Sequence, residues 1–162
     1  MGKDNIPDEV VKHLRLLEGS YFFQVLSISL NLDKNNSVGI DRPLYQDMSA
    51  LQILAEFIPA DKYWSDSTGQ VEFDDIIEHT CLMIDKLIEH GADINRLDSE
   101  DKNPLFNALI SNNTKIICKL VQLGANTLQV NVFGESALEV ATRLYKLSSI
   151  SEEAYRCITN EL

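Results

Sequence analysis

Apolar residues recur at helical spacing through most of the chain, and the pattern is clearest in the stretch 103–134. A short helix is predicted from Asn103, which is a favourable capping residue. Pro104 suits the first helical position, because an N–H group there would have no partner within the helix. Leu105, Ala108 and Leu109 give this helix an apolar side.

A second helix is predicted from Thr114, where apolar residues again recur at helical spacing. They are Ile116, Ile117, Leu120, Val121 and Leu123. Gly124 ends this helix as a glycine just past the last turn. Asn112 lies where the chain must reverse, and asparagine tolerates the left-handed backbone of such a turn. The stretch therefore predicts two helices joined by a tight turn.

This unit resembles an ankyrin repeat, whose pattern is D-x-x-G-x-T-P-L-H-x-A, a turn, an apolar helix and then G-A-D-x-N. The matching residues are Asp98, the hexapeptide 103–108 and residues 124–126. The period returns along the chain. The hexapeptide 136–141 lies 33 positions after 103–108, and residues 91–95 lie 33 positions before the segment that begins at Gly124.

A further hexapeptide, residues 49–54, lies 54 positions before 103–108, which is 21 more than one period. We therefore expect an insertion at about residues 58–70, which include Tyr63 and Trp64. Two interpretations of this aromatic pair stay open. It folds back onto the outer helices, or it is an exposed anchor for a partner, since tryptophan and tyrosine are enriched in binding hot spots.

The resemblance implies an all-α fold, an ankyrin-repeat solenoid of stacked antiparallel helix pairs with short hairpin-like fingers. We expect residues 1–47 to form an N-terminal helical cap or degenerate repeat and a loop. Residues 48–97 are then a first repeat with the insertion, 98–130 the central repeat, and 131–162 the last repeat with a C-terminal capping helix. The further helices expected are residues 7–17, 21–32, 48–57, 71–90, 136–147 and 151–158.

Three local departures from the repeat pattern give further expectations. In the first repeat Leu54 replaces the expected alanine and Gln52 the expected histidine, so we expect less regular packing there. The first finger, residues 93–101, lacks the glycine that usually ends its turn, which leaves the turn geometry open. In the second finger, residues 127–134, Asn131 and Gly134 suit the first and fourth positions of a type I turn.

The formal net charge is −11, which argues against nucleic acid and anionic membranes as partners, because phosphate binding requires clustered lysine and arginine. Residues 48–90 contain nine acidic and two basic side chains and so contribute −7. Two interpretations of this acidic segment stay open. It is a solvated helix face and loop, or it is a docking surface for a basic partner.

We expect a cytoplasmic, intracellular protein. The N-terminus is charged and lacks the apolar core of a secretory signal, and no run of about 20 apolar residues could span a bilayer. The three cysteines, Cys81, Cys118 and Cys157, are far apart, odd in number and without C-x-x-C spacing. We therefore interpret them as free, buried thiols in a reducing compartment.

No combination of residues predicts an enzyme. His79 and Cys81 are two positions apart on a predicted helix and so lie on different faces, which disfavours a zinc site. The glycine-rich patterns that bind nucleotide phosphates do not occur. We therefore expect a non-enzymatic protein with no catalytic residues, no metal and no cofactor.

The resemblance implies a protein–protein interaction module, a scaffold or adaptor, that holds a partner on a concave face built from finger tips and inner helices. Leu97, Val132 and Phe133 are the most informative of these positions, because apolar residues at hairpin tips have no core to enter. The alternative is that they pack finger against finger. The expected contact residues are Arg96, Leu97, Ser99, Glu100, Asn107, Gln129, Val132, Phe133 and Arg143.

Two further functions stay open. Ankyrin fingers are targets of an asparaginyl hydroxylase whose sites resemble an asparagine preceded eight positions earlier by leucine, and Asn95 with Leu87 matches that pattern. Alternatively, the protein is a structural subunit that docks through the acidic segment 56–89.

Overall fold

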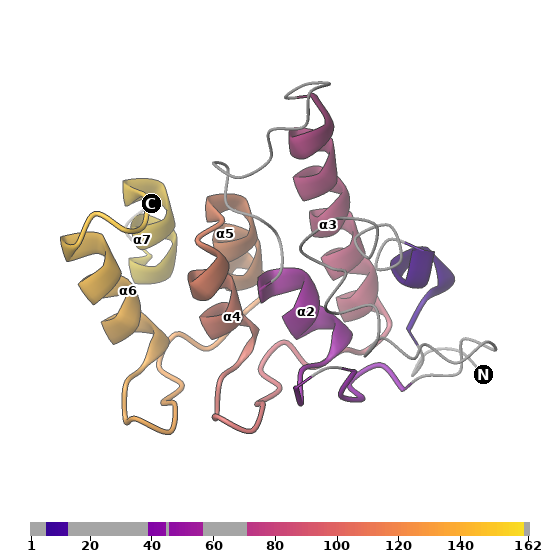
Figure 1. The fold of residues 1–162 in the computed structure, drawn as a ribbon, viewed down its shortest axis with the longest axis horizontal. Helices are drawn as coiled ribbons and strands as arrows, with labels where there is room; N and C mark the ends of the chain where they lie inside the picture. Colours follow the sequence, from indigo (N-terminus) through magenta and orange to yellow (C-terminus); the bar gives the residue numbers. More distant parts are fainter. Residues whose placement is uncertain (1–5, 13–38, 45, 57–70, 161–162) are drawn as a thin grey trace.

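The computed structural model describes residues 6–12, 39–44, 46–56 and 71–160 (Figure 1). Within these ranges the regular structure is helical, with an isolated antiparallel bridge that pairs Val130 with Ser136. The all-α prediction is therefore confirmed for this part of the chain. The expected helix 21–32 and the insertion 58–70 lie outside the described residues.

The helices agree closely with the ranges expected from the sequence. A short helical segment at 8–12 falls within the expected helix 7–17. The longest helix, α3, spans 19 residues and ends one residue before the predicted boundary. The named helices are α2 (Ala50–Glu56), α3 (Val71–Glu89), α4 (Pro104–Ser111), α5 (Thr114–Gln122), α6 (Ala137–Lys146) and α7 (Glu152–Thr159).

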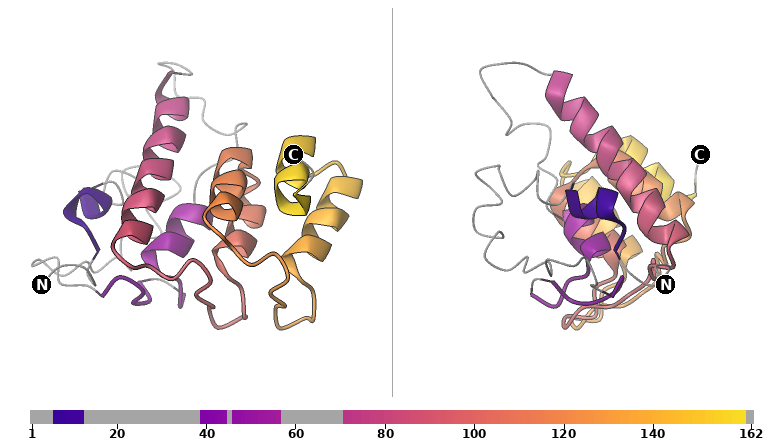
Figure 2. Two further views of the ribbon diagram at one scale, coloured as in Figure 1. Left: turned by 180° about the vertical axis from the view of Figure 1, so that it is seen from behind. Right: turned by 90° about the vertical axis from the view of Figure 1, so that its right-hand side faces the viewer.

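The helices form two rows, as both views in Figure 2 show. In the inner row α4 packs against α2 on one side and α6 on the other, and in the outer row α5 packs between α3 and α7. Each inner helix also packs on its own outer helix, which gives the pairs α2/α3, α4/α5 and α6/α7. This is the pairing predicted from the recurring hexapeptides.

Side-chain caps explain where these helices begin. The Asn103 side chain accepts from the Phe106 N–H at the start of α4, and the Asn113 side chain accepts from the Ile116 N–H at the start of α5. At α6, Ser136 and Glu139 form a reciprocal capping box. The backbone N–H and the hydroxyl of Ser136 both donate to the Glu139 carboxylate and hold its pKa below the ordinary glutamate value.

Helix ends follow the glycine and asparagine signals of the sequence. Asn112 has φ 55°, so it adopts the left-handed conformation predicted for the reversal between α4 and α5. Gly91 and Gly124, one period apart, have φ 93° and 95° just after α3 and α5. Only glycine adopts this backbone without a steric cost, which is why the outer helices end there.

The core lies between the two rows and runs through all three helix pairs. Leu54, which replaces the expected alanine of the first repeat, is completely buried in it. The departure from the repeat pattern is therefore accommodated within the core. The largest completely buried side chains are Leu51, Ile53, Leu54, Ile84, Leu87, Leu105, Ile116 and Ile117.

The two fingers have the same turn, although their sequences differ. The Asp98 Oδ1 atom accepts from the N–H groups of Glu100 and Lys102, at 2.8 and 3.0 Å. One period later, the Asn131 Oδ1 atom accepts from Phe133 and Glu135, at 2.9 and 3.1 Å. Aspartate and asparagine thus serve the same purpose, because each supplies a side-chain oxygen to the backbone of its own turn.

The last turn position explains how the first finger closes without glycine. Gly134 has φ 78° and donates its N–H to the Asn131 carbonyl at 2.9 Å, which is the hydrogen bond expected between the fourth and first turn residues. Asp101, the equivalent residue of the first finger, adopts φ 56° and donates to the Asp98 carbonyl at 3.0 Å. The turn geometry left open by the sequence is therefore left-handed at Asp101.

Replacing Asp101 with glycine should raise the free energy of unfolding by about 0.5–1 kcal/mol, because glycine adopts this backbone without the strain of a Cβ atom. Urea denaturation measures the change. Asp101→Asn is the matched control, since it removes the same charge but keeps a side chain that tolerates φ above zero. A glycine variant no more stable than the asparagine variant would contradict this explanation.

Candidate functional site

The two fingers project from the same side of the stack, beyond the N-terminal ends of α4 and α6 (Figure 1). Hydrogen bonds hold them together. The Val132 N–H donates to the Glu100 carbonyl at 3.1 Å, which joins the two tips. At the base, the Asn126 N–H donates to the Asn95 side chain at 2.7 Å. The fingers therefore form one connected surface.

The second finger carries a row of exposed apolar side chains, which we call the apolar finger. Phe133 is 80% exposed at its tip, and Val132 is 51% exposed beside it. The alternative that these two residues are buried by packing between the fingers is therefore wrong, although the tips are joined through their backbones. The apolar finger consists of Leu128, Val130, Val132 and Phe133.

Leu128 and Val130 were not among the residues expected from the sequence to contact a partner, yet the structure exposes both. A comparison of the two fingers at positions 33 residues apart identifies Leu128 and Val130. Leu128, Val132 and Phe133 replace the polar residues Asn95, Ser99 and Glu100 of the first finger, and Val130 is equivalent to Leu97. The second finger is thus apolar where the first is mostly polar.

Arg96 was expected to be a contact residue, but its side chain is bound within the protein and only 16% exposed. Its guanidinium donates to the Asp47 carbonyl and to Gln52 Oε1, both at 2.7 Å, and pairs with the Asp47 carboxylate at 3.4 Å. Gln52 is completely buried, and its Oε1 atom accepts from both Arg96 and the Ser49 N–H. Arg96 therefore positions the first finger on α2.

Asn107 was expected on the exposed side of α4, and this expectation is wrong. Asn107 is completely buried, because α4 packs between α2 and α6. Its amide donates to the Glu56 carboxylate at 2.7 Å and its side-chain oxygen lies 3.4 Å from Gln52 Nε2. The residue thus ties the central repeat to the first one and is not accessible to a partner.

The other expected contact residues lie near the fingers. Ser99 and Glu100 are exposed at the first finger tip, and Gln129 is half-buried, with its amide donating to the Val130 carbonyl at 3.0 Å. Arg143 on α6 is exposed and forms an ion pair with Glu135, at the end of the second finger. Leu97 is 37% exposed.

A pocket of about 300 Å³ lies between the first finger and α2. Burial by itself would lower the pKa of Lys102 in this pocket, but a hydrogen bond to Glu100 and the nearby carboxylates outweigh it and raise that pKa above the ordinary value. Lys102 is already paired with Glu100 at 2.9 Å, so the lining as a whole is acidic. The lining residues are Gln46, Met48, Glu56, Asp98, Ser99, Glu100 and Lys102.

Asn95, the expected hydroxylation site, is half-buried at the base of the first finger. Its side-chain oxygen accepts from Asn126 N–H at 2.7 Å and lies 3.4 Å from the Asn103 amide. Leu87, the matching leucine, is completely buried in α3. Access to Asn95 for an enzyme therefore requires these bonds between repeats to open.

The acidic segment lies largely on α3, whose residues 77–89 have described side chains. Asp85 is paired with Lys119 of α5 at 2.6 Å, and Glu78 and Glu89 are exposed. Lys86 lies 3.9 Å from Glu9. The described acidic side chains of α3 are thus partly paired and partly exposed.

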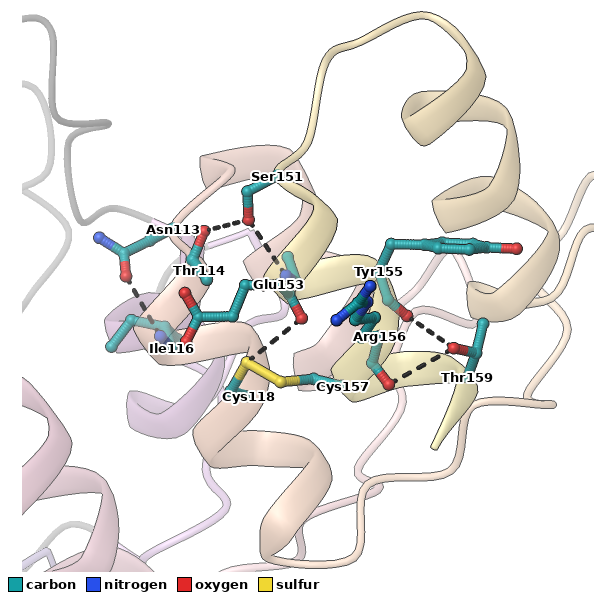
Figure 3. Close-up of a disulfide and its surroundings, with 11 residues drawn as sticks. Asn113, Thr114, Ile116, Cys118, Ser151, Glu153, Tyr155, Arg156, Cys157 and Thr159 are labelled. Atoms are coloured by element: carbon teal, nitrogen blue, oxygen red, sulfur yellow. Dashed lines mark hydrogen bonds between the residues drawn. A yellow bond between two sulfur atoms is a disulfide. The ribbon is translucent and has the colours of Figure 1, made fainter. Parts of the chain in front are cut away.

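The interpretation of all three cysteines as free, buried thiols is wrong. Cys118 and Cys157 form a disulfide, with Cα atoms 5.3 Å apart (Figure 3). They are 39 residues apart in sequence, but α5 and α7 are neighbours in the outer row, which brings the two sulfurs together. Cys81 is a free cysteine and is half-buried, and burial raises its pKa.

Among the described residues, no three histidine, cysteine or acidic side chains converge as metal ligands. No helix in the same part of the chain has the length and hydropathy needed to cross a membrane.

Comparison with known families matches residues 82–121 to the family described as ankyrin repeats (many copies). The match covers the last eight residues of α3, the first finger, α4 and most of α5. The resemblance found in the sequence is therefore confirmed. A search of the curated proteins found no match to this chain.

Replacing Arg96 with alanine should lower the free energy of unfolding by about 1–3 kcal/mol, because buried Gln52 loses a charged donor. Urea denaturation measures the change. Arg143→Ala is the matched control, since it removes an exposed ion pair and should cost less than about 1 kcal/mol. Equal effects of the two substitutions would show that Arg96 does not hold the first finger on α2.

Proposed function

We propose that this ankyrin-repeat protein binds a protein partner on the face formed by its fingers and inner helices, with the apolar finger as the main anchor. The observation that carries the proposal is the exposure of Phe133 and Val132 on a finger that hydrogen bonds hold in place. Ankyrin repeats are in general protein–protein interaction modules. A scaffold or adaptor role follows from such binding.

Burial of the apolar finger supplies the affinity in this proposal. Transfer of one phenylalanine side chain from water to an apolar interface contributes about 1.5–3 kcal/mol. The finger is held by the Val132 N–H bond to Glu100 and by the bonds of Asn131 to its own turn. Because the backbone is already ordered, little conformational entropy is lost when a partner binds.

The charges around the fingers indicate the chemistry of the partner. Arg96, Lys102 and Arg143 are all paired with carboxylates of this chain. Exposed acids lie nearby, including Glu100 and Asp101 at the first finger. We therefore expect an apolar side chain of the partner on the apolar finger and a lysine or arginine toward the acidic pocket. Nucleic acid does not fit this surface, because it would need unpaired basic residues.

The acidic outer helix α3 is the competing surface. Exposed carboxylates there mainly steer encounter and are screened by salt, whereas buried apolar anchors dominate affinity. The exposed carboxylates of α3 accordingly affect the rate of association with the partner. The finger residues determine how long the complex lasts.

A photo-crosslinking amino acid at position 133 identifies the partner in lysate, with the same group at exposed Leu82 of α3 as the control. Once the partner is identified, Phe133→Ala should weaken its binding about thirtyfold or more, as truncation of an interface hot spot does. Titration calorimetry or surface plasmon resonance measures the affinity.

Leu82→Ala is the matched control, because Leu82 is also apolar and 57% exposed but lies on the outer row. It should bind as the unmodified chain does. The charge variant Glu78→Gln with Glu89→Gln should mainly slow association at low salt. Normal binding by Phe133→Ala, together with loss of binding by the charge variant even at high salt, would refute the proposal and favour the acidic surface.

A further inference from the structure

We propose that the Cys118–Cys157 disulfide is a redox-sensitive staple that holds the last repeat, and with it the apolar finger, in place. The two cysteines belong to α5 and α7, the outer helices of successive pairs (Figure 3). The loop that the bond closes contains α6 and the whole second finger. The effect of the disulfide on stability is independent of the proposed function, whereas its effect on binding rests on the proposed function.

The position of the bond matters because the last helix pair has a packing neighbour on one side only, within the described residues. Repeat arrays are stabilised by contacts between adjacent repeats, so a terminal repeat has fewer of them and opens most readily. Here α6 packs on α4, and α7 packs on α5. A covalent bond from α5 to α7 resists the opening of this pair.

Noncovalent contacts also hold α7 in place, and none of them requires the disulfide. At its start, the hydroxyls of Ser151 and Thr114 are 2.7 Å apart (Figure 3). Ala154 and Ile158 are buried in the core. The rings of Tyr155 and of Tyr145 on α6 are stacked, with their centroids 4.4 Å apart. These contacts persist when the disulfide is reduced. The reduced protein is therefore folded, with a last repeat that opens more often.

The two cysteines differ in solvent exposure, which determines which sulfur an incoming thiolate attacks. Cys157 is only 5% exposed, whereas Cys118 is half-buried at the surface of α5. An incoming thiolate therefore reaches the sulfur of Cys118. It forms a mixed disulfide there, the bond between Cys118 and Cys157 breaks, and Cys157 leaves as a thiolate that takes up a proton.

A second thiolate then attacks the small-molecule sulfur of the mixed disulfide and releases Cys118. In total, two small thiols such as glutathione are oxidised to one disulfide, and two electrons and two protons reach the cysteines. In the reverse direction a small disulfide oxidises the pair through the same mixed disulfide. Cys81 does not compete, because its half-buried thiol has a raised pKa and so little reactive thiolate.

Hydrogen exchange on the 162-residue chain with Cys81→Ser, oxidised and then reduced with excess dithiothreitol, tests the staple without a partner. Reduction should speed exchange of the amides in residues 127–159 roughly 30- to 1,000-fold, the range expected for loss of a disulfide that closes a long loop. Amides of α4 should change little. Equal exchange rates in the two states would overturn the proposal. The variant Cys118→Ser with Cys157→Ser should not respond to dithiothreitol.

Trapping of the mixed disulfide tests the direction of exchange. With glutathione disulfide, Cys157→Ser should take up one glutathione at Cys118, whereas Cys118→Ser should stay unmodified at Cys157, as measured by intact mass. The opposite result would overturn the assignment of Cys118 as the entry point. With an identified partner, reduction should weaken binding. Normal binding by Phe133→Ala would refute the proposed function. The hydrogen-exchange experiment would still test the effect of the disulfide on the last repeat.

Discussion

None of these helix pairs can bury its apolar side alone, and the rest of the structure depends on the contact between successive pairs. Each inner helix must pack closely on the next, which brings backbone and side-chain polar groups into the interface. A buried polar group without a hydrogen bond costs about 1–3 kcal/mol, so these groups must find partners in the neighbouring repeat. The bonds between repeats therefore determine where the fingers lie.

Asn103 illustrates this constraint. It is completely buried, caps α4 through the Phe106 N–H, and donates to the Asn126 carbonyl at 3.0 Å. One side chain thus starts a helix and fixes the base of the next finger. Gln52 does the same on the N-terminal side, where it contacts Lys102, Asn107 and Arg96. The helices and the fingers are consequently held by one polar network.

The same constraint separates the side chains available to a partner from those that hold the fold. Arg96 and Asn107 lie near the fingers in sequence, but the network between repeats uses both. The side chains of Phe133 and Val132 have no part in that network, because the Asn131 side chain and backbone groups form the hydrogen bonds of their finger. Around the fingers, the exposed side chains are thus largely apolar and acidic, while Arg96 and Lys102 are paired with carboxylates of this chain.

The helix pairs and the cap at Asn103 could be predicted from the sequence alone, because both follow from local rules. Apolar spacing, the capping residue Asn103, and glycine after the outer helices act within one or two turns of the chain. The recurrence of 33 residues then placed the fingers and identified Phe133 as a residue without a core to enter. Six of the nine expected contact residues are exposed for this reason.

The side chains that meet across repeats could be identified only from the packed structure. Three contacts join residues that are 39 or more positions apart. They are the pairing of Arg96 with Asp47 and Gln52, the hydrogen bond from buried Asn107 to Glu56, and the disulfide from Cys118 to Cys157. Such contacts depend on the rotation and spacing of neighbouring helices. A local pattern carries no information about either, since both arise from the packing of the whole stack.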